Sequence, residues 1–440
     1  MSMPIYQALK KYAEKNSIRF HTPGNKGHLD GIDDVFAAFS QYDVTELTDS
    51  DDLYNPKSAI LEAEQAAQKF YNTNLTIFSA GGATLCIQTA LSLFRGKKVL
   101  FERNTHSSIH TSSAFLDIDS VYIHNQINDF GIPEAINFNE LEKFLEKDPE
   151  IEAFFITSPN YYGVCADIKN IKKVCEKFNV TLIVDQAHGS HLFLSDKSLS
   201  ATDKADIIID SAHKTLPVLT GGAFLHFNID ISREKAKNLM RNFGSTSPFF
   251  PILASLDYAR NWCETIGQEI TLNINKNIKK LQKIIINNGY FIKNNNFQDI
   301  YHLTIITEND GEVLNNQLYE NNIIAEMHDK NTVLLLFSPT NIQNDFDIIT
   351  DFFESHPYNK KIIPKKYIIP KLETVIKTKT AMFANNKALK LKNSVNKICH
   401  KAVFAYPPGT PIILPGEKIS AEMIDFIKNN YEIDTVHVLI

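Results

Sequence analysis

Short apolar runs alternate with stretches of helical spacing through the first two thirds of the chain. The runs predict strands at residues 76–78, 99–101, 121–123, 153–156, 182–184, 207–209 and 223–225. From Pro56 onward, Ile60, Ala63, Ala67 and Phe70 recur at three- and four-residue spacing, which is typical of an amphipathic helix. Because the runs are apolar without alternation, we expect an α/β fold in which helices cover both faces of a largely parallel sheet.

The pattern changes after about residue 289. A long helical stretch at 252–286 is expected to link two domains, and Asn- and Lys-rich loops at 294–296 and 360–366 then separate fewer elements. Strands are predicted at 300–306 and 333–337 and a late helix at 419–430. The sequence therefore predicts an N-terminal arm (1–31), a large domain (32–288) and a smaller α+β C-terminal domain (289–440).

Composition indicates an intracellular enzyme. The 440 residues are 43% hydrophobic, enough for substantial cores, and the formal net charge of −6 gives no basic surface for nucleic acid. The five cysteines are odd in number and lack metal-ligand spacing, which favours reduced thiols in the cytoplasm and no metal site. We expect neither a secretory leader nor a membrane span.

A lysine follows one of the predicted strands directly. The strand at 207–209 leads into Ser211-Ala212-His213-Lys214, at the carboxyl edge where open α/β sheets bind ligands. A primary amine there, with a hydroxyl and an imidazole beside it, can hold a phosphorylated aldehyde as an imine. Lys214 is therefore our candidate Schiff-base lysine for pyridoxal 5′-phosphate; the alternative is a solvated loop charge.

Asp185 ends the neighbouring predicted strand in the same way. Pyridoxal phosphate withdraws electrons best when its ring nitrogen is protonated, and a carboxylate beside that nitrogen keeps the proton there. Two such charges about 4 Å apart gain roughly 4 kcal/mol at an effective dielectric of about 20. The alternative is that Asp185 caps a helix or a turn.

A phosphate cradle is expected upstream. The strand at 76–78 runs into Gly81-Gly82-Ala83-Thr84 and then a predicted helix at 84–94, whose N-terminus offers free N–H groups and a positive dipole end. The alternative is that this turn only connects the strand to the helix and binds no phosphate. His106, after the strand at 99–101, supplies a flat imidazole that could stack on a pyridine ring, or it is an ordinary polar residue.

Together these segments resemble the Orn/Lys/Arg decarboxylase family, in its short Gram-positive-type form. The family has the fold of aspartate aminotransferase, fold type I of the pyridoxal-phosphate enzymes. The matching segments run through nearly the whole chain: His21-Thr22-Pro23-Gly24-Asn25-Lys26-Gly27, Asp43-Val44-Thr45-Glu46, Asp51-Asp52-Leu53, Arg103-Asn104-Thr105-His106, Asp185-Gln186-Ala187-His188-Gly189, Ser211 to Pro217, Ser245-Thr246-Ser247-Pro248, Ala254-Ser255-Leu256-Asp257 and Ala405-Tyr406-Pro407-Pro408-Gly409.

The resemblance implies a role for each matching residue. Lys214 would carry the cofactor, Asp185 would pair with the pyridinium, His106 would stack on the ring and His188 would line the pocket beneath it. The phosphate would lie among Gly82, Ala83, Thr84, Ser211 and His213. Lys214 or His213 would return a proton to the substrate. Thr246 and Ser247 resemble a segment that reaches a neighbouring subunit's site, which implies a homodimer or larger even assembly; the alternative is a turn before Pro248.

Four positions depart from the family pattern. Ala83 removes a hydroxyl from the cradle, which we expect to weaken phosphate binding by roughly 1 to 2 kcal/mol. Gln186 replaces a usual Glu and Asn25 a usual His. Asn393 stands where the family has a glutamate that can face the substrate's distal cation. Either another acid, such as Glu46, Asp51 or Glu417, substitutes for it, or the substrate is less basic.

The predicted function is decarboxylation of arginine, lysine or ornithine to the corresponding amine and carbon dioxide. Two alternatives remain. An aminotransferase or lyase of the same fold would keep Lys214 and Asp185 but give other products, and a descendant without turnover, acting as a binding protein, would explain Ala83, Gln186 and Asn393 together.

Overall fold

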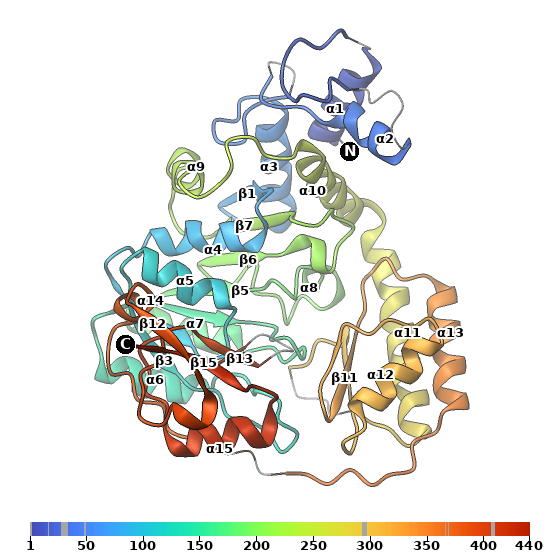
Figure 1. Ribbon diagram of the computed structural model, residues 1–440. Coiled ribbons are helices and arrows are strands. Elements are labelled where there is room, and N and C mark those ends of the chain that lie inside the picture. The colour runs from blue at the N-terminus through green and yellow to red at the C-terminus, as the bar shows by residue number, and fades with distance from the viewer. Residues whose placement is uncertain are drawn as a thin grey trace.

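The structure is a computed structural model that describes residues 2–15, 17–27, 34–47, 50–292, 297–365, 367, 369–405 and 410–440. Its central element is a seven-stranded sheet in the order β1-β7-β6-β5-β4-β2-β3 (Figure 1). The strands are β1 Leu75–Ser79, β2 Lys98–Glu102, β3 Asp119–Ile123, β4 Ile151–Thr157, β5 Thr181–Asp185, β6 Ile207–Asp210 and β7 Ala223–Phe227.

All seven strands lie where the apolar runs predict them, and the mostly parallel sheet is confirmed. The exception is β7, which pairs antiparallel with both β1 and β6, while the other neighbouring pairs are parallel. An apolar run has the same appearance in either direction, so the sequence pattern does not predict this reversal.

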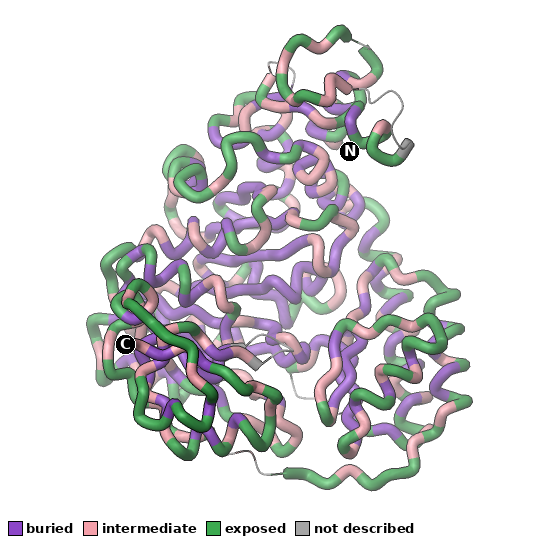
Figure 2. Tube along the Cα trace, in the orientation of Figure 1, coloured by how far each residue is buried: buried purple, intermediate pink, exposed green. Residues whose placement is uncertain are grey.

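Helices cover both faces of the sheet, as expected from strands that are apolar on both sides. Along β5 and β6, Ile183 and Ile209 belong to one hydrophobic cluster, and Val184 and Ile208 to the other. Figure 2 shows these strands as a buried centre. The helices of the large unit are α1 Pro4–Glu14, α2 Asp34–Tyr42, α3 Ala59–Tyr71, α4 Gly82–Ser92, α5 Ser107–Phe115, α6 Phe138–Lys147, α7 Ile168–Lys177, α8 Leu192–Ser195, α9 Arg233–Arg241 and α10 Phe250–Trp262.

A continuous helical stretch leads from the large unit to a second sheet. Helix α10 passes through a π-helical turn, Cys263–Gly267, into α11, Gln268–Asn287, which confirms the predicted helix at 252–286. A side chain at Gly267 would lie 2.9 Å from the Trp262 ring, so the turn requires glycine. The second sheet has the order β10-β11-β9-β8 and packs against α11, α12 and α13.

The bounds in this unit differ slightly from the predicted ones. They are β8 Phe291–Ile292, β9 His302–Ile306, α12 Gly311–Glu320, β10 Met327–His328, β11 Thr332–Leu336 and α13 Gln343–Ser355. The predicted strand at 300–306 begins only at His302, because the Tyr301 N–H donates to Asp299 Oδ1, at 3.0 Å, rather than to a neighbouring strand. The predicted loop residues 294–296 lie outside the described residues.

The last part of the chain forms a separate small cluster beside β2 and β3 (Figure 1). Its elements are α14 Thr378–Met382, β12 Asn386–Lys390, β13 Val403–Ala405, β14 Thr410–Ile413, α15 Ala421–Asn430 and β15 Thr435–Leu439. The predicted helix at 419–430 begins at Ala421 because the Ser420 hydroxyl caps it. The segment 406–409 lies outside the described residues, and the predicted boundaries at residues 31 and 288 stay predictions.

In the described part of the chain, no helix combines the length and apolarity that a bilayer span requires. The five cysteines are free and buried, and the described residues contain no cluster of histidine, cysteine or acidic side chains suited to a metal ion.

Candidate cofactor site

Lys214 lies just beyond the carboxyl end of β6. The strand ends at Asp210, and a short 3₁₀ turn, Ala212–Lys214, turns the lysine back over the sheet edge. Its Nζ lies 3.0 Å from His188 Nε2, within hydrogen-bonding distance. Burial lowers the pKa of Lys214, against the opposing charges of Asp185 and Glu326. A partly desolvated amine is a better nucleophile toward an aldehyde than a surface lysine.

Asp185 is the last residue of β5 and is 2% exposed. Burial raises the pKa of its carboxyl to about 6, although the Lys214 charge and the Ala187 N–H, 3.0 Å from Oδ1, both favour the carboxylate. A cationic partner would therefore stabilise Asp185 in its ionised form. The structure brings Lys214 and Asp185 together, as the strand-end argument predicts.

Two imidazoles adjoin the lysine. His106 is the N-cap of α5, where its Nδ1 accepts from the Ser108 N–H at 3.2 Å. His188 is buried and lies edge-on to the Tyr161 ring, 4.6 Å between centroids. Burial and the Lys214 charge lower the pKa of both histidines, which favours their neutral forms. Neutral, flat rings beside Lys214 suit contact with an aromatic cofactor.

The predicted phosphate cradle is the first turn of α4. The helix begins at Gly82, two residues before the predicted start, so Ala83 and Thr84 also offer first-turn N–H groups. No side chain caps this end, and a Cβ built on Gly82, whose φ is +68°, would meet nothing within 4 Å. The helix end is therefore open to an anion.

The turn at Gly221 and Gly222 is hydrogen-bonded both to this helix end and to the segment that carries Lys214. Gly221 O accepts from the Gly82 N–H at 2.7 Å, and Gly222 O accepts from the His213 N–H at 3.2 Å. The Ser211 hydroxyl lies 3.4 Å from His213 Nδ1. The predicted phosphate residues from two distant segments thus share one side of the site. His213 faces Gly222, whereas His188 is the imidazole that hydrogen-bonds Lys214.

The residues present fit pyridoxal phosphate. An uncapped helix end suits a phosphate, a buried carboxylate suits a protonated ring nitrogen, and a partly desolvated lysine suits the aldehyde. Thr157, the last residue of β4, pairs with Asp185 in the sheet, and its buried Oγ1 has no hydrogen-bond partner among the described residues. An unpaired buried hydroxyl at this position is consistent with a polar ligand.

Sequence reasoning missed Thr157 and also Glu102, the last residue of β2. One Glu102 oxygen accepts from the Thr157 N–H at 2.7 Å, and burial raises the pKa of this carboxyl to about 7. Both residues end parallel strands, as Asp185 does. Taking every polar strand-end residue as a candidate would have found them.

Thr246 lies apart from these groups. It is exposed on the loop between α9 and α10, where the Tyr54 hydroxyl donates to Ser245 O at 2.9 Å. In the described residues it makes no hydrogen bond to Lys214 or to the phosphate residues. Gly244 lies against Leu85 of α4, so the loop borders the helix end and leaves Thr246 facing outward.

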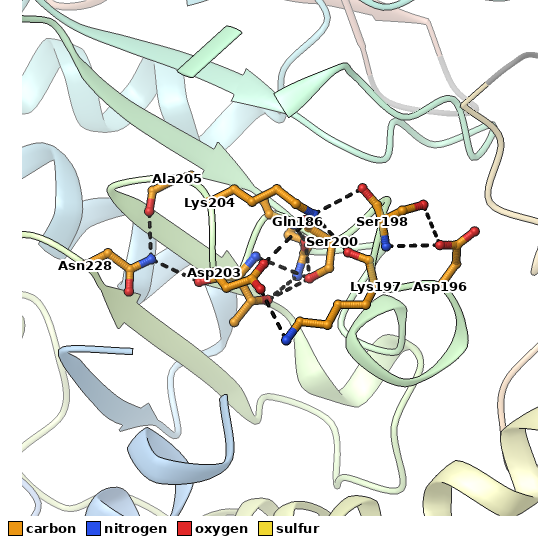
Figure 3. Close-up of polar contacts among 11 residues, drawn as sticks. Gln186, Asp196, Lys197, Ser198, Ser200, Asp203, Lys204, Ala205 and Asn228 are labelled. Carbon is orange, nitrogen blue, oxygen red and sulfur yellow. Dashed lines mark hydrogen bonds and ion pairs between the residues drawn. The ribbon is translucent and has the colours of Figure 1, made fainter. Parts of the chain in front are cut away.

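The hydrogen bonds of Gln186 explain why a glutamine stands at this position. Its Nε2 donates to Asp210 Oδ1 at 2.9 Å and to Thr202 Oγ1 at 3.1 Å, and its Oε1 accepts from the Ala201 N–H at 2.6 Å. A glutamate here would place a second carboxylate against Asp210. Figure 3 shows Gln186 inside a loop that Lys204 closes by donating to three backbone carbonyls, those of Lys197, Ser198 and Ser200.

The acids expected to replace the missing distal glutamate are mostly engaged elsewhere. Asp51 accepts backbone N–H groups on both oxygens, including those of Lys57 and Ile60. Glu417 forms a buried two-point ion pair with Arg103, at 2.8 and 2.9 Å. Glu46 and Asn393 are exposed. The structure therefore does not support Asp51 or Glu417 as the substitute.

The Arg103–Glu417 pair predicts a large effect on stability. Glu417→Gln leaves the Arg103 guanidinium buried without a counter-charge, and we expect the attachment of residues 386–439 to weaken by about 3 to 5 kcal/mol. Hydrogen exchange of β12 and β15 measures this loss. The control is Lys379→Ala, which breaks the exposed pair with Asp117, 3.0 Å apart, and should have a much smaller effect because solvent screens this pair. Equal exchange rates in the two variants would contradict the prediction.

Comparison with known proteins places both parts of the chain in one family. The chain matches the Orn/Lys/Arg decarboxylase major-domain model over residues 3–311 and the C-terminal-domain model of the same family over residues 366–436. It is 30% identical to the arginine decarboxylase of Bacillus subtilis (strain 168), over 98% of this chain and 94% of that protein.

Two solved structures share the fold. Lysine decarboxylase A from Pseudomonas aeruginosa superposes with a TM-score of 0.84 at 16% identity, over 99% of this chain and 80% of that one. A structure of SPT with PLP superposes with a TM-score of 0.58 at 16% identity, over 81% of this chain and 84% of that one. The predicted fold type I is thereby confirmed. On the match of both domain models, the chain belongs to the pyridoxal-phosphate-dependent Orn/Lys/Arg decarboxylase family.

Proposed function

We propose that the protein decarboxylates a basic amino acid, with arginine first among arginine, lysine and ornithine. The observation that carries this proposal is Lys214 at the carboxyl edge of the sheet, with its Nζ 3.0 Å from His188 Nε2 and with Asp185 near enough for its charge to act on the amine. Arginine comes first because a relative that covers nearly the whole chain is named an arginine decarboxylase.

Each residue of the site has a part in this reaction. Lys214 would attach the cofactor, Asp185 would keep a positive charge on the ring nitrogen, and His106 and His188 would supply the flat rings beside it. The first turn of α4, from Gly82 to Thr84, would hold the phosphate with Ser211 and His213. Pyridoxal phosphate supplies an electron sink for the pair left on the α-carbon when the carboxylate departs.

Proton return is assigned to Lys214. The α-carbon needs a proton after carbon dioxide leaves, and an amine near neutral pKa delivers one more readily than an ordinary lysine does. Burial lowers the Lys214 pKa in that direction, and His188, 3.0 Å away, can exchange a proton with Nζ. His213 is the second candidate, although its ring faces Gly222.

A substrate panel tests the proposal. Purified protein is supplied with pyridoxal phosphate and then with arginine, lysine, ornithine or a neutral amino acid, and products are identified by mass spectrometry. We expect the amine that lacks the carboxyl group from at least one basic substrate. A keto acid would indicate an aminotransferase, and cofactor binding without any product would indicate a descendant without turnover.

We also propose a homodimer or larger even assembly in the cytoplasm. The N-terminal part exposes large apolar side chains, with Ile18 86%, Phe20 94% and Phe36 66% exposed in the single chain. Large apolar side chains exposed in one part of a chain are typical of a subunit interface. The five buried thiols agree with a reducing compartment.

Light scattering of the active protein measures the assembly directly. We expect at least twice the 49.8 kDa chain mass. Because burial of an apolar ring is lost and a charge is introduced, Phe36→Glu should shift the population toward monomer, whereas Ile324→Glu, at a residue 81% exposed on the second sheet unit, should not. An active wild-type monomer would contradict the assignment.

A further inference from the structure

A buried cluster of two histidines and one aspartate lies next to His188. Asp299 Oδ1 lies 3.1 Å from His191 Nε2, and Asp299 Oδ2 lies 2.7 Å from His302 Nδ1, so one carboxylate holds both imidazoles. The three side chains are at most 1% exposed. A carboxylate buried to this extent needs a compensating positive charge, and a proton on one of the two imidazoles supplies it.

The cluster joins the large unit to the second sheet unit. His191 immediately precedes α8, whereas His302 begins β9. The Asp299 N–H donates to Gly163 O at 2.8 Å, in the turn after β4. Gly163 has a φ of +79°, and a Cβ there would lie 2.5 Å from that of His302, so the close approach of the two units requires glycine. No local pattern marks the cluster, because Asp299 lies 108 positions beyond His191.

His302 also borders the imidazole that contacts Lys214. The rings of His188 and His302 lie edge to face, 5.7 Å between centroids, and His188 Nε2 lies 3.0 Å from Lys214 Nζ. His302 Nε2 is buried and has no hydrogen-bond partner among the described residues. Because Nδ1 faces Asp299, Nε2 is the nitrogen available for proton exchange with His188, after a small rotation of the rings or through one water molecule.

Decarboxylation consumes one proton in every turnover, because carbon dioxide leaves and the α-carbon takes a hydrogen in its place. A bound substrate separates Lys214 from bulk water, so the next proton has to come through neighbouring side chains. Burial and the Lys214 charge lower the pKa of His188, so this imidazole transfers a proton more readily than it retains one.

The titratable groups that face the two imidazoles belong to both units. In the described part of the chain they are Lys214, His106 and Tyr161 around His188, and Asp299 and His191 around His302.

We propose that His302, held by Asp299, is the proton reservoir of the site. The inference rests on the proposed function. The His302 imidazolium gives one proton from Nε2 to the His188 ring, and His188 gives one from Nε2 to Lys214 Nζ, which leaves both imidazoles neutral. A proton from solvent then restores His302. Because His302 acts through His188, it supplies and positions a proton and does not contact the substrate.

A comparison of the first turnover with later ones tests the proposal. His302→Asn keeps an N–H group for Asp299 and removes the titratable ring. Cofactor-loaded protein is mixed rapidly with the basic amino acid that the substrate panel identifies. We expect a burst of one amine per site at the wild-type rate, because the first proton is already in the site, followed by turnovers at least about tenfold slower than in the wild type.

The matched control is Tyr301→Phe, which removes a buried hydroxyl without a hydrogen-bond partner in the described residues and leaves the neighbouring cluster titratable. We expect it to show wild-type rates and no burst. If His302→Asn slows the first and the later turnovers equally, the histidine has a structural role and the proposal is overturned. Unchanged rates in His302→Asn would overturn it as well.

Nuclear magnetic resonance without substrate separates this proposal from the proposed function. A histidine with an ordinary pKa of about 6.5 is neutral at pH 8, so an imidazolium signal at that pH marks a ring held by a carboxylate. With isotope-labelled histidine, we expect such a signal in the wild type and in His191→Asn, and its loss in His302→Asn.

This pattern would support the reservoir even if no amino acid is decarboxylated. A wild type without any imidazolium at pH 8 would overturn the proposal, whatever the substrate panel shows, because the cluster would have no proton to give. A signal that is lost in His191→Asn and kept in His302→Asn would place the proton on His191 and overturn it too.

Discussion

Lys214→Ala is expected to abolish covalent attachment of the cofactor. Wild-type protein with pyridoxal phosphate should be yellow, and borohydride should fix the cofactor on the peptide that contains Lys214, because this partly desolvated amine lies beyond β6 with Asp185 and His188 beside it. Loss of proton transfer alone should lower turnover by about 10² to 10⁴-fold. Mass spectrometry of the reduced, digested protein measures the attachment.

The control for this prediction is Lys235→Ala, which removes an exposed lysine on α9 and should leave both the colour and the adduct unchanged. A wild-type protein that stays colourless with added cofactor would refute the site. So would an adduct on any other lysine.

Asp185→Asn is expected to have the second-largest effect. The substitution keeps the shape of the side chain and removes the charge that holds a proton on the cofactor ring. An ion pair at about 4 Å is worth roughly 4 kcal/mol at an effective dielectric of about 20, so we expect kcat to fall by up to about 10³-fold. Asp196→Asn, an exposed turn residue, is the control.

Asp185→Asn should also change how the affinity for pyridoxal phosphate depends on pH. Without cofactor, burial raises the pKa of Asp185 to about 6, so the carboxylate is charged above that pH and neutral below it. Because a cationic ring nitrogen binds the charged form, affinity for pyridoxal phosphate should be full above pH 6 and fall as the pH decreases through that value. Titrations between pH 5 and 8 should show this component in the wild type and lack it in Asp185→Asn. A component that survives in the variant would assign it to another group.

The strand-end argument explains why much of the site could be predicted. Asp185 directly follows an apolar run and Lys214 lies one short turn beyond another, and parallel strands bring their carboxyl ends to one edge whatever the rest of the fold does. The uncapped helix at Gly82 has the same kind of local signal. These residues could be predicted without knowing which distant segments are in contact.

Other parts of the site depend on contacts between segments far apart in the sequence. Tyr161 meets Glu326 only because the second sheet unit packs against the turn after β4. The sequence alone does not explain why residue 186 is a glutamine, because the group that requires an amide there is Asp210, at the end of the neighbouring strand. The reversed direction of β7 has no local signal either, since its apolar run would suit a parallel strand equally well.

Release of the labelled carboxyl group tests the central claim most directly. Arginine, lysine or ornithine labelled at the α-carboxyl carbon is incubated with the cofactor-loaded wild type and with Lys214→Ala, and trapped labelled carbon dioxide is compared with the amine formed. The account predicts one molecule of labelled carbon dioxide for each molecule of amine from a basic substrate in the wild type, and none above background in Lys214→Ala. Consumption of the amino acid with the label retained in a keto acid, or equal release by both proteins, would contradict it.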